Sequence, residues 1–288
     1  MTKSFPIDIE TPLIPPLKIQ GIKTKLINFI SSNISWDGKG VFYEPFMGSG
    51  SVGFNLAPDR AVFCDINPYL IQFYQAIQSG EVTKDSTRLF LTENALKLSA
   101  TPADKNSYYY TVRDRFNAHH DPHDFLFLQR SNFNGLMRFN SKGEYNVPFG
   151  RNPNKFSPSL VDTISSQVGA LENLFAGHPD WVFVHRDFQE VFSQASRGDF
   201  VYLDPPYIGL NDGYFQPWGK KNANTLARLA RKSPADYALS MWYKDKDGNV
   251  NDYLKLWQGS DVKYFDHTYR VGPKKENRGS VVEALVLS

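Results

Sequence analysis

The stretch GVFYEPFMGSGSVGFNLA, residues 40–57, decides the fold. Residues 40–46 are an apolar run typical of a buried β-strand, and residues 48–57 are a glycine-rich turn that opens a helix. Glycine at such a turn lets backbone N–H groups approach a ligand closely, at the electropositive end of the following helix. The pattern therefore predicts a strand–turn–helix unit of an α/β protein, with a ligand-binding turn at its centre.

The segments around this unit repeat the alternation of strand and helix. Residues 60–66 and 67–80 are predicted as the next strand and helix, because Pro68 falls in the first helical turn and Gly80 follows the last. The opening dozen residues are predicted to be a loosely held tail. Further helices are expected at 22–33 and 223–233, and further strands at 180–188, 199–204, 236–242, 261–269 and 280–288. The expected fold class is α/β, with a Rossmann-like, doubly wound sheet.

Residues 81–175 have a different character from the rest of the chain. Helical patches around 105–117 and 122–131 precede a polar stretch, NFNGLMRFNSKGEYNVPFG, that is rich in glycine and asparagine. We therefore predict a catalytic domain formed by residues 1–80 and 176–288, into which a smaller, mostly helical domain of residues 81–175 is inserted.

Composition limits the class of protein. The 288 residues are 41% hydrophobic and 22% charged, which is typical of a globular protein, and no apolar run is long enough to predict a transmembrane helix. The N-terminus lacks a continuous apolar segment, so we do not expect secretion or a membrane partner. The single cysteine, Cys64, excludes an internal disulfide and favours a core residue over a nucleophile. An intracellular, cytoplasmic protein is expected.

Two basic segments interrupt a chain whose net charge is only +2. Residues 130–156 contain five basic residues and one acidic residue, and residues 263–278 contain five basic and two acidic residues. Local basic patches on a nearly neutral protein suit a partner with a phosphate backbone, although solvated loops are the alternative for either segment alone.

Acidic residues at the ends of neighbouring strands support a nucleotide pocket beside the glycine turn. Asp65 ends the next strand, where a carboxylate can accept both hydroxyl groups of a ribose. Asp187 and Phe188 follow another strand at the same edge. The Gly-Ser-Gly turn is shorter than a dinucleotide fingerprint, and no Gly-Lys-Ser/Thr follows it, so neither a dehydrogenase nor a P-loop fits. A ribose, an adenine and a small charged tail would fit this pocket.

The stretch GDFVYLDPPYIGL, residues 198–210, places Asp-Pro-Pro-Tyr directly after an apolar strand. Asp204 and the carbonyl of Pro205, which Pro206 helps to hold in place, could accept the two hydrogens of an exocyclic amine and free its lone pair for attack. Tyr207 could stack on a purine. The alternative is that the prolines merely end the strand.

Six segments of the chain resemble a known family, the Dam-like adenine-N6 DNA methyltransferases, many of which serve type II restriction–modification systems. The segments that carry the resemblance are PPLKIQGIKTKLI, YEPFMGSGSV, FCDINPYLI, FLFLQRSNFNGLMRFNSKGEYNVPFG, DFVYLDPPY and NRGSVVEALV, in the motif order of the alpha class. The stretch FNGLMRFNSKGEYNVPFG is the most specific of them. The family often has Trp-Ala-Gly-Gly-Lys near its start, where this chain has Ile19-Gln20-Gly21-Ile22-Lys23 and lacks the aromatic residue.

The resemblance implies a methyl donor, a target and a set of site residues. The donor would be S-adenosylmethionine, with no metal, and the target would be N6 of an adenine flipped from double-stranded DNA. A β-hairpin in the insert would read the sequence, and a cognate restriction endonuclease could act separately. The catalytic residues would be Asp204, Pro205, Pro206 and Tyr207. The donor would contact Ile19, Lys23, Phe46, Gly48, Gly50, Asp65, Asp187, Phe188 and Asp204. DNA would contact Lys18, Arg130, Phe133, Asn134, Arg138, Asn140 and Arg151.

Base chemistry agrees with the DNA contacts, since arginine can bond guanine, asparagine can bond adenine, and an exposed phenylalanine can wedge between bases. Two other functions use similar motifs: methylation of RNA or of a protein glutamine, and DNA binding without catalysis. The histidine-rich stretch NAHHDPHD, residues 117–124, invites a metal site, but a polar loop is expected because methyl transfer from a sulfonium needs no metal.

Overall fold

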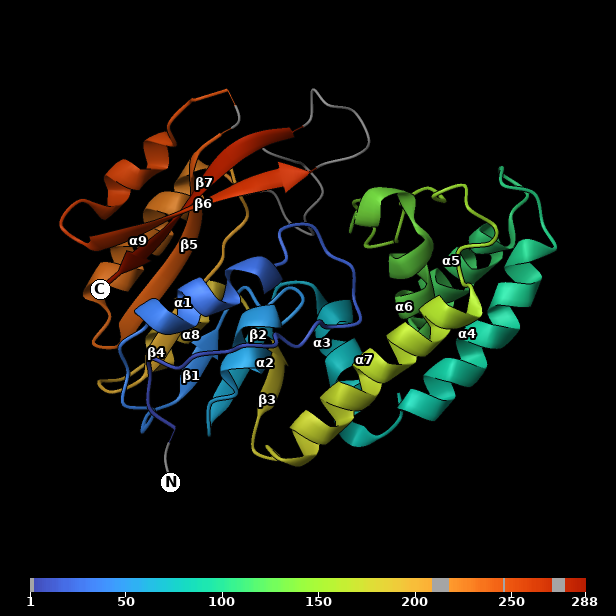
Figure 1. Ribbon diagram of the computed structural model, residues 1–288, viewed down its shortest axis with the longest axis horizontal. Helices are drawn as coiled ribbons and strands as arrows, with labels where there is room; N and C mark the ends of the chain where they lie inside the picture. The colour runs from blue at the N-terminus through green and yellow to red at the C-terminus, as the bar shows by residue number, and fades with distance from the viewer. Residues whose placement is uncertain (1–2, 209–217, 246, 271–277) are drawn as a thin grey trace.

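The computed structural model describes residues 3–208, 218–245, 247–270 and 278–288 (Figure 1). These residues form one seven-stranded sheet, in the order β3-β2-β1-β4-β5-β7-β6. The first five strands in this order are parallel, and β7 runs antiparallel between β5 and β6. The strands are β1 (Phe42–Glu44), β2 (Ala61–Asp65), β3 (Val182–His185), β4 (Phe200–Leu203), β5 (Asp236–Lys244), β6 (Asp261–Arg270) and β7 (Arg278–Leu287). The mixed sheet confirms the expected α/β fold class.

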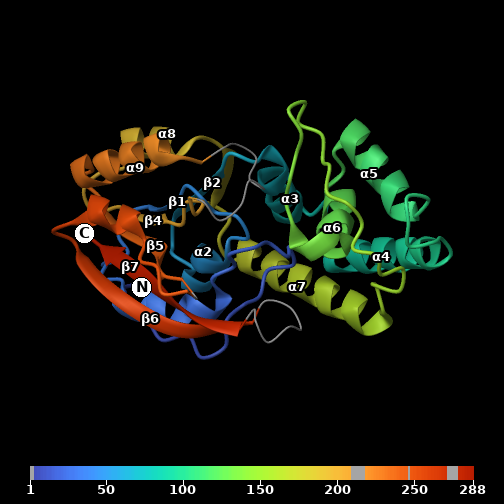
Figure 2. The same cartoon turned by 90° about the horizontal axis from the view of Figure 1, so that it is seen from above.

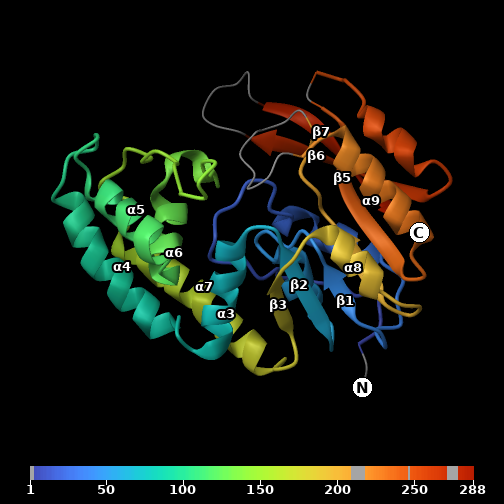
Figure 3. The same cartoon turned by 180° about the vertical axis from the view of Figure 1, so that it is seen from behind.

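Helices cover both faces of the sheet, as the views from above and from behind show (Figures 2 and 3). Alternation along β4 illustrates why, because Phe200 and Tyr202 belong to one buried cluster while Val201 and Leu203 belong to the other. The first face packs against η1 (Thr24–Leu26), α1 (Ile27–Asn33), α2 (Ser51–Leu56), α3 (Pro68–Ser79) and α7 (Pro158–Ala176). The second packs against α8 (Phe188–Gln194), α9 (Lys220–Lys232) and η3 (Asp252–Trp257).

A group of helices lies beside the sheet, at the right of Figure 1. It consists of α4 (Lys84–Ser99), α5 (Tyr108–His119), α6 (Pro122–Ser131) and α7, followed in the chain by β3; α6 leads into η2 (Phe133–Gly135). Serine, threonine or aspartate side chains cap the start of each of the four α-helices. The apolar cluster on the first face of the sheet continues into these helices. Insertion of a separate domain at residues 81–175 stays a prediction.

The expected tail at the N-terminus is wrong. Phe5 is only 6% exposed, and its ring stacks on Trp36 with 5.5 Å between the ring centroids. The backbone N–H of Phe5 also donates to the carbonyl of Trp36 at 2.8 Å. The backbone N–H of Ile9 donates to the side chain of Asn28 at 3.0 Å, and Ile7 and Ile9 also pack against the main apolar cluster. The segment is therefore fixed by several contacts with distant parts of the chain, which its local composition does not indicate. No helix in the described part of the chain is long and apolar enough to cross a membrane.

Candidate active site and nucleic-acid interface

The candidate site lies where the strand order reverses. β1 is hydrogen-bonded to β2 on one side and to β4 on the other, all parallel, so the carboxyl ends of β1 and β4 open side by side. Connections leave these two strands toward opposite sides, which creates a crevice in which α/β sheets bind their ligands. The predicted glycine turn follows β1 and the Asp-Pro-Pro-Tyr motif follows β4, so the fold brings the two motifs together.

The glycine turn has the backbone conformation that its sequence predicts. Gly48 and Gly50 have φ values of +47° and +68°, in the left-handed region that favours glycine. A Cβ atom at Gly50 would collide with the ring of Phe54, so this position also lacks room for a side chain. A Cβ atom at Gly48 would meet nothing within 4 Å, which leaves open space over the turn where α2 begins. The turn can therefore admit a ligand close to its backbone.

Asp65 lies at the end of β2 and faces this turn. Its Oδ2 accepts the N–H of Gly48 at 3.0 Å, and its Oδ1 accepts the N–H of Asn67 at 2.9 Å. Each carboxylate oxygen can accept a further hydrogen bond, so two hydroxyl groups of a ribose fit the remaining capacity. Burial raises the pKa of Asp65 from 3.8 to about 6, against the effect of the two backbone donors.

Glu44, the last residue of β1, is a site residue that the sequence reasoning missed. Its side chain is 2% exposed, and Oε2 accepts the N–H of Gly53 in α2 at 3.0 Å. Burial raises the pKa of Glu44 well above its ordinary value, and the negative charges of Asp204 and Asp65 add to this effect. A carboxylate in an otherwise apolar strand was the available signal, since such a residue is seldom buried without a partner.

Asp204 is held by a lysine from the N-terminal motif. The Nζ of Lys23 lies 2.8 Å from Oδ2 of Asp204 and 3.0 Å from the carbonyl oxygen of Gly21. The described part of the chain supplies no hydrogen-bond partner to Oδ1 of Asp204, so this atom can accept a hydrogen from a substrate. Burial raises the pKa of Asp204, and the charge of Lys23 partly offsets this. Lys23 therefore contacts the Asp-Pro-Pro-Tyr motif directly, in addition to being one of the residues predicted to contact the donor.

Tyr207 completes the motif. Its ring centroid lies 5.2 Å from the Nζ of Lys23, and its hydroxyl donates to Oε2 of Glu283 on β7 at 2.9 Å. Burial raises the pKa of Tyr207 well above its ordinary value, with Glu283 as the next cause. The hydroxyl therefore remains protonated at neutral pH, and the ring is suited to stacking rather than to proton transfer. Sequence reasoning did not identify Glu283 as a site residue.

Three rings gather on the second face of the sheet beside the crevice. Phe46 stacks on Phe188 with 5.4 Å between the ring centroids. Trp218 meets both rings edge-on, with its centroid 5.3 Å from that of Phe46 and 5.5 Å from that of Phe188. Trp218 was not predicted. Asp187 caps α8, because its side chain accepts the N–H of Gln189 at 2.9 Å. The carboxylate of Asp187 therefore has a structural partner already, whereas the three rings offer an apolar wall to an adenine.

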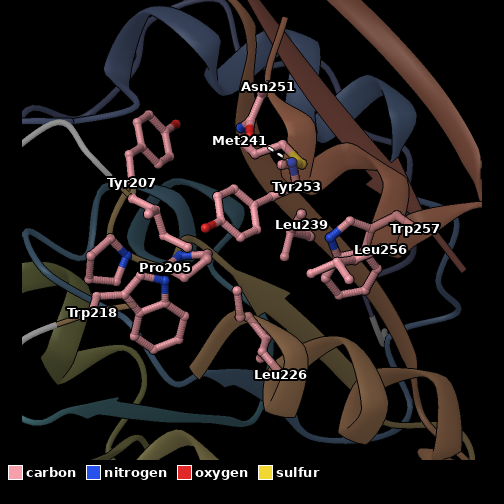
Figure 4. A pocket seen from close by; sticks show the side chains of 13 residues that line it. Pro205, Tyr207, Trp218, Leu226, Leu239, Met241, Asn251, Tyr253, Leu256 and Trp257 are labelled. Carbon is pink, nitrogen blue, oxygen red and sulfur yellow. Dashed lines mark hydrogen bonds between the residues drawn. The ribbon is translucent and has the colours of Figure 1, made fainter. Parts of the chain in front are cut away.

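A small apolar hollow lies behind the motif, between β5, α9 and η3 (Figure 4). The ring of Tyr253 points toward Pro205, while Tyr207 lies at the rim with its hydroxyl turned away from Trp218. The hollow has a volume of about 40 Å³, which holds little more than a water molecule and excludes a purine.

The predicted recognition segment forms a loose hairpin after α6. Isolated bridges join Asn132 to Phe149 and Phe139 to Tyr145, without a regular strand ladder. Asn140 shapes the tip, because its Oδ1 accepts the N–H groups of Lys142 and Glu144 at 2.9 and 3.0 Å. This fold-back explains the composition of the segment, since asparagine and glycine supply local bonds and positive φ angles.

The candidate DNA-reading side chains lie along this hairpin. Phe133 is 48% exposed, and Asn134 beside it has a φ of +57°. Arg138 is exposed, and Asn146 holds its guanidinium through the side-chain oxygen at 2.8 Å and the backbone oxygen at 3.1 Å. Arg151 is also exposed, but no described hydrogen bond or ion pair joins it to the others. Of this set, Asn140 has a clear structural role at the hairpin tip.

A second group of cations connects the N-terminal motif to the hairpin. The backbone of Lys18 passes over Gly135, whose Cβ would lie 3.2 Å from the Lys18 carbonyl oxygen. The Nη1 of Arg130 donates to the carbonyl of Pro16 at 3.0 Å, while its Nε is buried without a partner. Burial lowers the pKa of Lys155, and the charges of Lys18 and Arg130 lower it further. We call Lys18, Arg130 and Lys155 the cationic cluster.

Two further features that the sequence singled out are Ile19 and the histidine-rich stretch, residues 117–124. Ile19, where the family often has an aromatic residue, is half-buried against the main apolar cluster. The expected polar loop at residues 117–124 is wrong, because residues 117–119 end α5 and residues 122–124 begin α6. Asp121 caps α6, and Asp124 is paired with Arg115. No group of three potential ligands, His, Cys, Asp or Glu, is placed to hold a metal in the ranges that the structure describes.

Comparison with known proteins agrees with these features. The sequence profile of the family described as D12 class N6 adenine-specific DNA methyltransferase matches residues 20–270. The DNA adenine methylase of Haemophilus influenzae is 29% identical over 285 residues, covering 95% of this chain and 93% of that protein. Type II methyltransferase M.MjaIII of Methanocaldococcus jannaschii is 30% identical over 304 residues, covering 95% and 98%. Type II methyltransferase M1.LlaDCHI of Lactococcus lactis subsp. cremoris is 33% identical over 262 residues, covering 85% of each.

Proposed function

The chain belongs to the D12 class N6 adenine-specific DNA methyltransferases, and we propose that it moves the methyl group of S-adenosylmethionine to N6 of an adenine flipped from duplex DNA. The observation that carries the finer proposal is the meeting of two motifs at one switch point. The glycine turn after β1 and the Asp-Pro-Pro-Tyr motif after β4 open on one crevice. One ligand can therefore lie beside the other, as a group transfer requires.

The residues around the crevice fit S-adenosylmethionine in three respects. Asp65 can accept two ribose hydroxyl groups with the capacity that its backbone bonds leave. The open space over Gly48 suits the close approach of a charged tail. Phe46, Phe188 and Trp218 offer rings to the adenine. The bound donor would supply an electrophilic methyl group on a sulfonium.

Asp204 and Pro205 prepare the target amine. Lys23 holds Oδ2 of Asp204 at 2.8 Å, which aims the other carboxylate oxygen for the substrate. One amine hydrogen would form a hydrogen bond to Oδ1 of Asp204, and the second would form a hydrogen bond to the carbonyl oxygen of Pro205. With both hydrogens accepted, the nitrogen lone pair is localised toward the methyl group, and the carboxylate offsets the positive charge that develops on nitrogen. Tyr207 would carry the base by stacking.

The hairpin residues suit sequence-specific binding to duplex DNA. The exposed ring of Phe133 can fill the gap that a flipped base leaves, which offsets part of the cost of flipping. The guanidinium of Arg138, held by Asn146, can bond a guanine edge with its remaining donors. Asn134 and Arg151, both exposed, would add base or phosphate contacts.

The cationic cluster is the proposed phosphate clamp, because its crowded charges lack an acidic partner among the described residues. Replacing Lys155 by glutamine should weaken binding to every duplex and lower the slope of log K against log salt by about 1, since one phosphate contact is lost. Fluorescence anisotropy over a salt series measures this slope. Lys221→Gln, an exposed lysine on α9, is the matched control and should leave the slope unchanged. Equal slopes for wild type and Lys155→Gln would rule out the clamp.

We also propose that the enzyme protects DNA within a restriction–modification system, which its similarity to type II methyltransferases supports. A cognate endonuclease would then recognise the same site. Expression in a host without adenine methylation should make host DNA resistant to one endonuclease specificity. A host genome that stays sensitive to all specificities matching the methylated motif would argue against this biological role while leaving the enzymatic activity intact.

The direct test offers labelled S-adenosylmethionine and the purified protein to duplex DNA, RNA and protein in separate reactions. We expect label only in DNA, at N6 of adenine within one short motif that sequencing of methylated DNA identifies. Transfer to RNA or to glutamine instead would replace the proposed substrate. Normal donor binding without transfer to any DNA would reduce the protein to a DNA-binding module.

A further inference from the structure

We propose that Glu283 is a positioning residue that fixes the ring of Tyr207, an inference that rests on the proposed role of this tyrosine as the platform for the flipped base. The hydroxyl of Tyr207 donates to Oε2 of Glu283 at 2.9 Å. Glu283 is only 7% exposed, although it lies 76 residues away in the sequence. Burying a carboxylate costs desolvation free energy, so a buried carboxylate that faces the motif from another strand needs an interaction that offsets this cost.

The location of Glu283 makes it a rigid anchor. It lies on β7, in register with Trp242 of β5 on one side and Phe265 of β6 on the other. Strands hydrogen-bonded on both sides move little, so the carboxylate is fixed by the sheet. Tyr207, in contrast, follows the end of β4 and has left the ladder. Prolines fix the backbone before Tyr207, but they do not fix the torsions of its side chain.

The hydrogen bond to Glu283 therefore restricts the side-chain torsions of Tyr207, which the prolines of the motif do not fix. A tyrosine ring with its hydroxyl tethered cannot swing away from the motif, so the face for the base is ready before the base arrives. The same geometry explains the cation beside the ring, because Lys23 lies 5.2 Å from the ring centroid and 2.8 Å from Asp204. Asp204, Lys23, Tyr207 and Glu283 thus form one connected network that aligns the base platform with the amine acceptor.

Positioning through the hydroxyl predicts coupled substitutions. Glu283→Ala and Tyr207→Phe should each lower kcat about tenfold, because a loosely held platform misplaces the amine. The donor dissociation constant should stay within twofold, since neither residue contacts the donor. The double variant should be no worse than either single variant, because both remove the same bond. Glu283→Gln keeps an acceptor oxygen in the same place and should retain most of the activity.

A spectroscopic readout separates positioning from folding and from chemistry. Duplex DNA with 2-aminopurine at the target position cannot be methylated at N6. Its fluorescence is quenched by stacking, on its neighbours in free DNA or on an aromatic ring after flipping, and it rises when the base is flipped but not stacked. The wild-type complex should be quenched, and the complexes of Glu283→Ala and Tyr207→Phe should be brighter. Tyr237→Phe removes the hydroxyl that bonds Ser260 at 3.0 Å on the same sheet and serves as the matched control, with unchanged fluorescence and kcat.

The outcomes distinguish the two proposals. If the wild type methylates DNA while Glu283→Ala and Tyr207→Phe leave kcat and fluorescence unchanged, the positioning role is overturned and the proposed function stands. Additive losses in the double variant would also overturn it, as would a loss in melting temperature without a change in kcat. If Glu283→Ala does not fold, Tyr207→Phe and Glu283→Gln decide alone. A wild type that methylates no adenine would overturn both proposals.

Discussion

Replacing Asp204 by alanine should lower kcat for adenine methylation about a thousandfold, the upper range for loss of one preorganised electrostatic partner. In the proposed mechanism the carboxylate accepts an amine hydrogen and faces the nitrogen on which positive charge develops, so its effect should be largest in the transition state. The affinity for S-adenosylmethionine should fall far less than kcat, because Asp65 and the glycine turn remain although the donor contact of Asp204 is lost. Single-turnover methylation and calorimetric titration of the donor measure the two quantities separately.

Controls for this substitution must address Lys23, which loses its ion pair with Asp204. Asp204→Asn keeps an acceptor oxygen and the shape of the side chain, so its loss in kcat should be smaller than that of alanine. Asp199→Asn changes a buried acid at the other end of the same strand, where it accepts the N–H groups of Val41 and Ser196. It should alter thermal stability and leave kcat within a factor of about two, as a change far from the chemistry does. Full activity of Asp204→Ala would exclude the proposed mechanism.

The sequence predicts the framework of this site because its main motifs are local. The glycine turn needs positive φ angles, and the glycines at positions 48 and 50 indicate these angles directly in the sequence. The position of Asp204 follows from the end of an apolar strand, which parallel topology carries to the crevice. The pairing of Lys23 with Asp204 is different, because it joins segments 181 residues apart whose approach depends on the whole fold.

Apart from Glu44, the features that sequence reasoning missed depend on contacts between segments that lie far apart in the sequence. Glu283 lies in a strand of apolar residues, and only the order β5-β7-β6 places it opposite Tyr207. Trp218 joins Phe46 and Phe188 through side-chain packing that no local pattern encodes. The N-terminal segment was predicted as a tail because its composition resembles one, whereas contacts such as the burial of Phe5 on Trp36 decide its structure. In each case the stabilising partner lies far along the chain.

The second large effect concerns Asp65 and pH. Replacing Asp65 by alanine should weaken binding of S-adenosylmethionine about a hundredfold at pH 8, since hydrogen bonds to a charged acceptor contribute about 1.5–3 kcal/mol each. In the proposed donor site the ionised carboxylate is the form that would accept both ribose hydroxyl groups, and burial raises the pKa of Asp65 to about 6. Donor affinity of the wild type should therefore be constant above pH 7 and fall as the pH drops through 6.

The direction of this pH dependence follows from linkage. A ligand that prefers the ionised carboxylate can bind below the pKa of that group only if the carboxyl group first loses its proton. Affinity should thus fall by at most tenfold per pH unit below 6, and bound donor should shift the pKa of Asp65 downward. Asp65→Asn cannot titrate, so its weaker affinity should lack the bend. The charge of His185 lowers the pKa of Asp65, and His185→Gln should keep the bend if Asp65 causes it. A bend that persists in Asp65→Asn would show that ionisation of this carboxylate, which the N–H groups of Gly48 and Asn67 hold in place, does not govern binding of the donor.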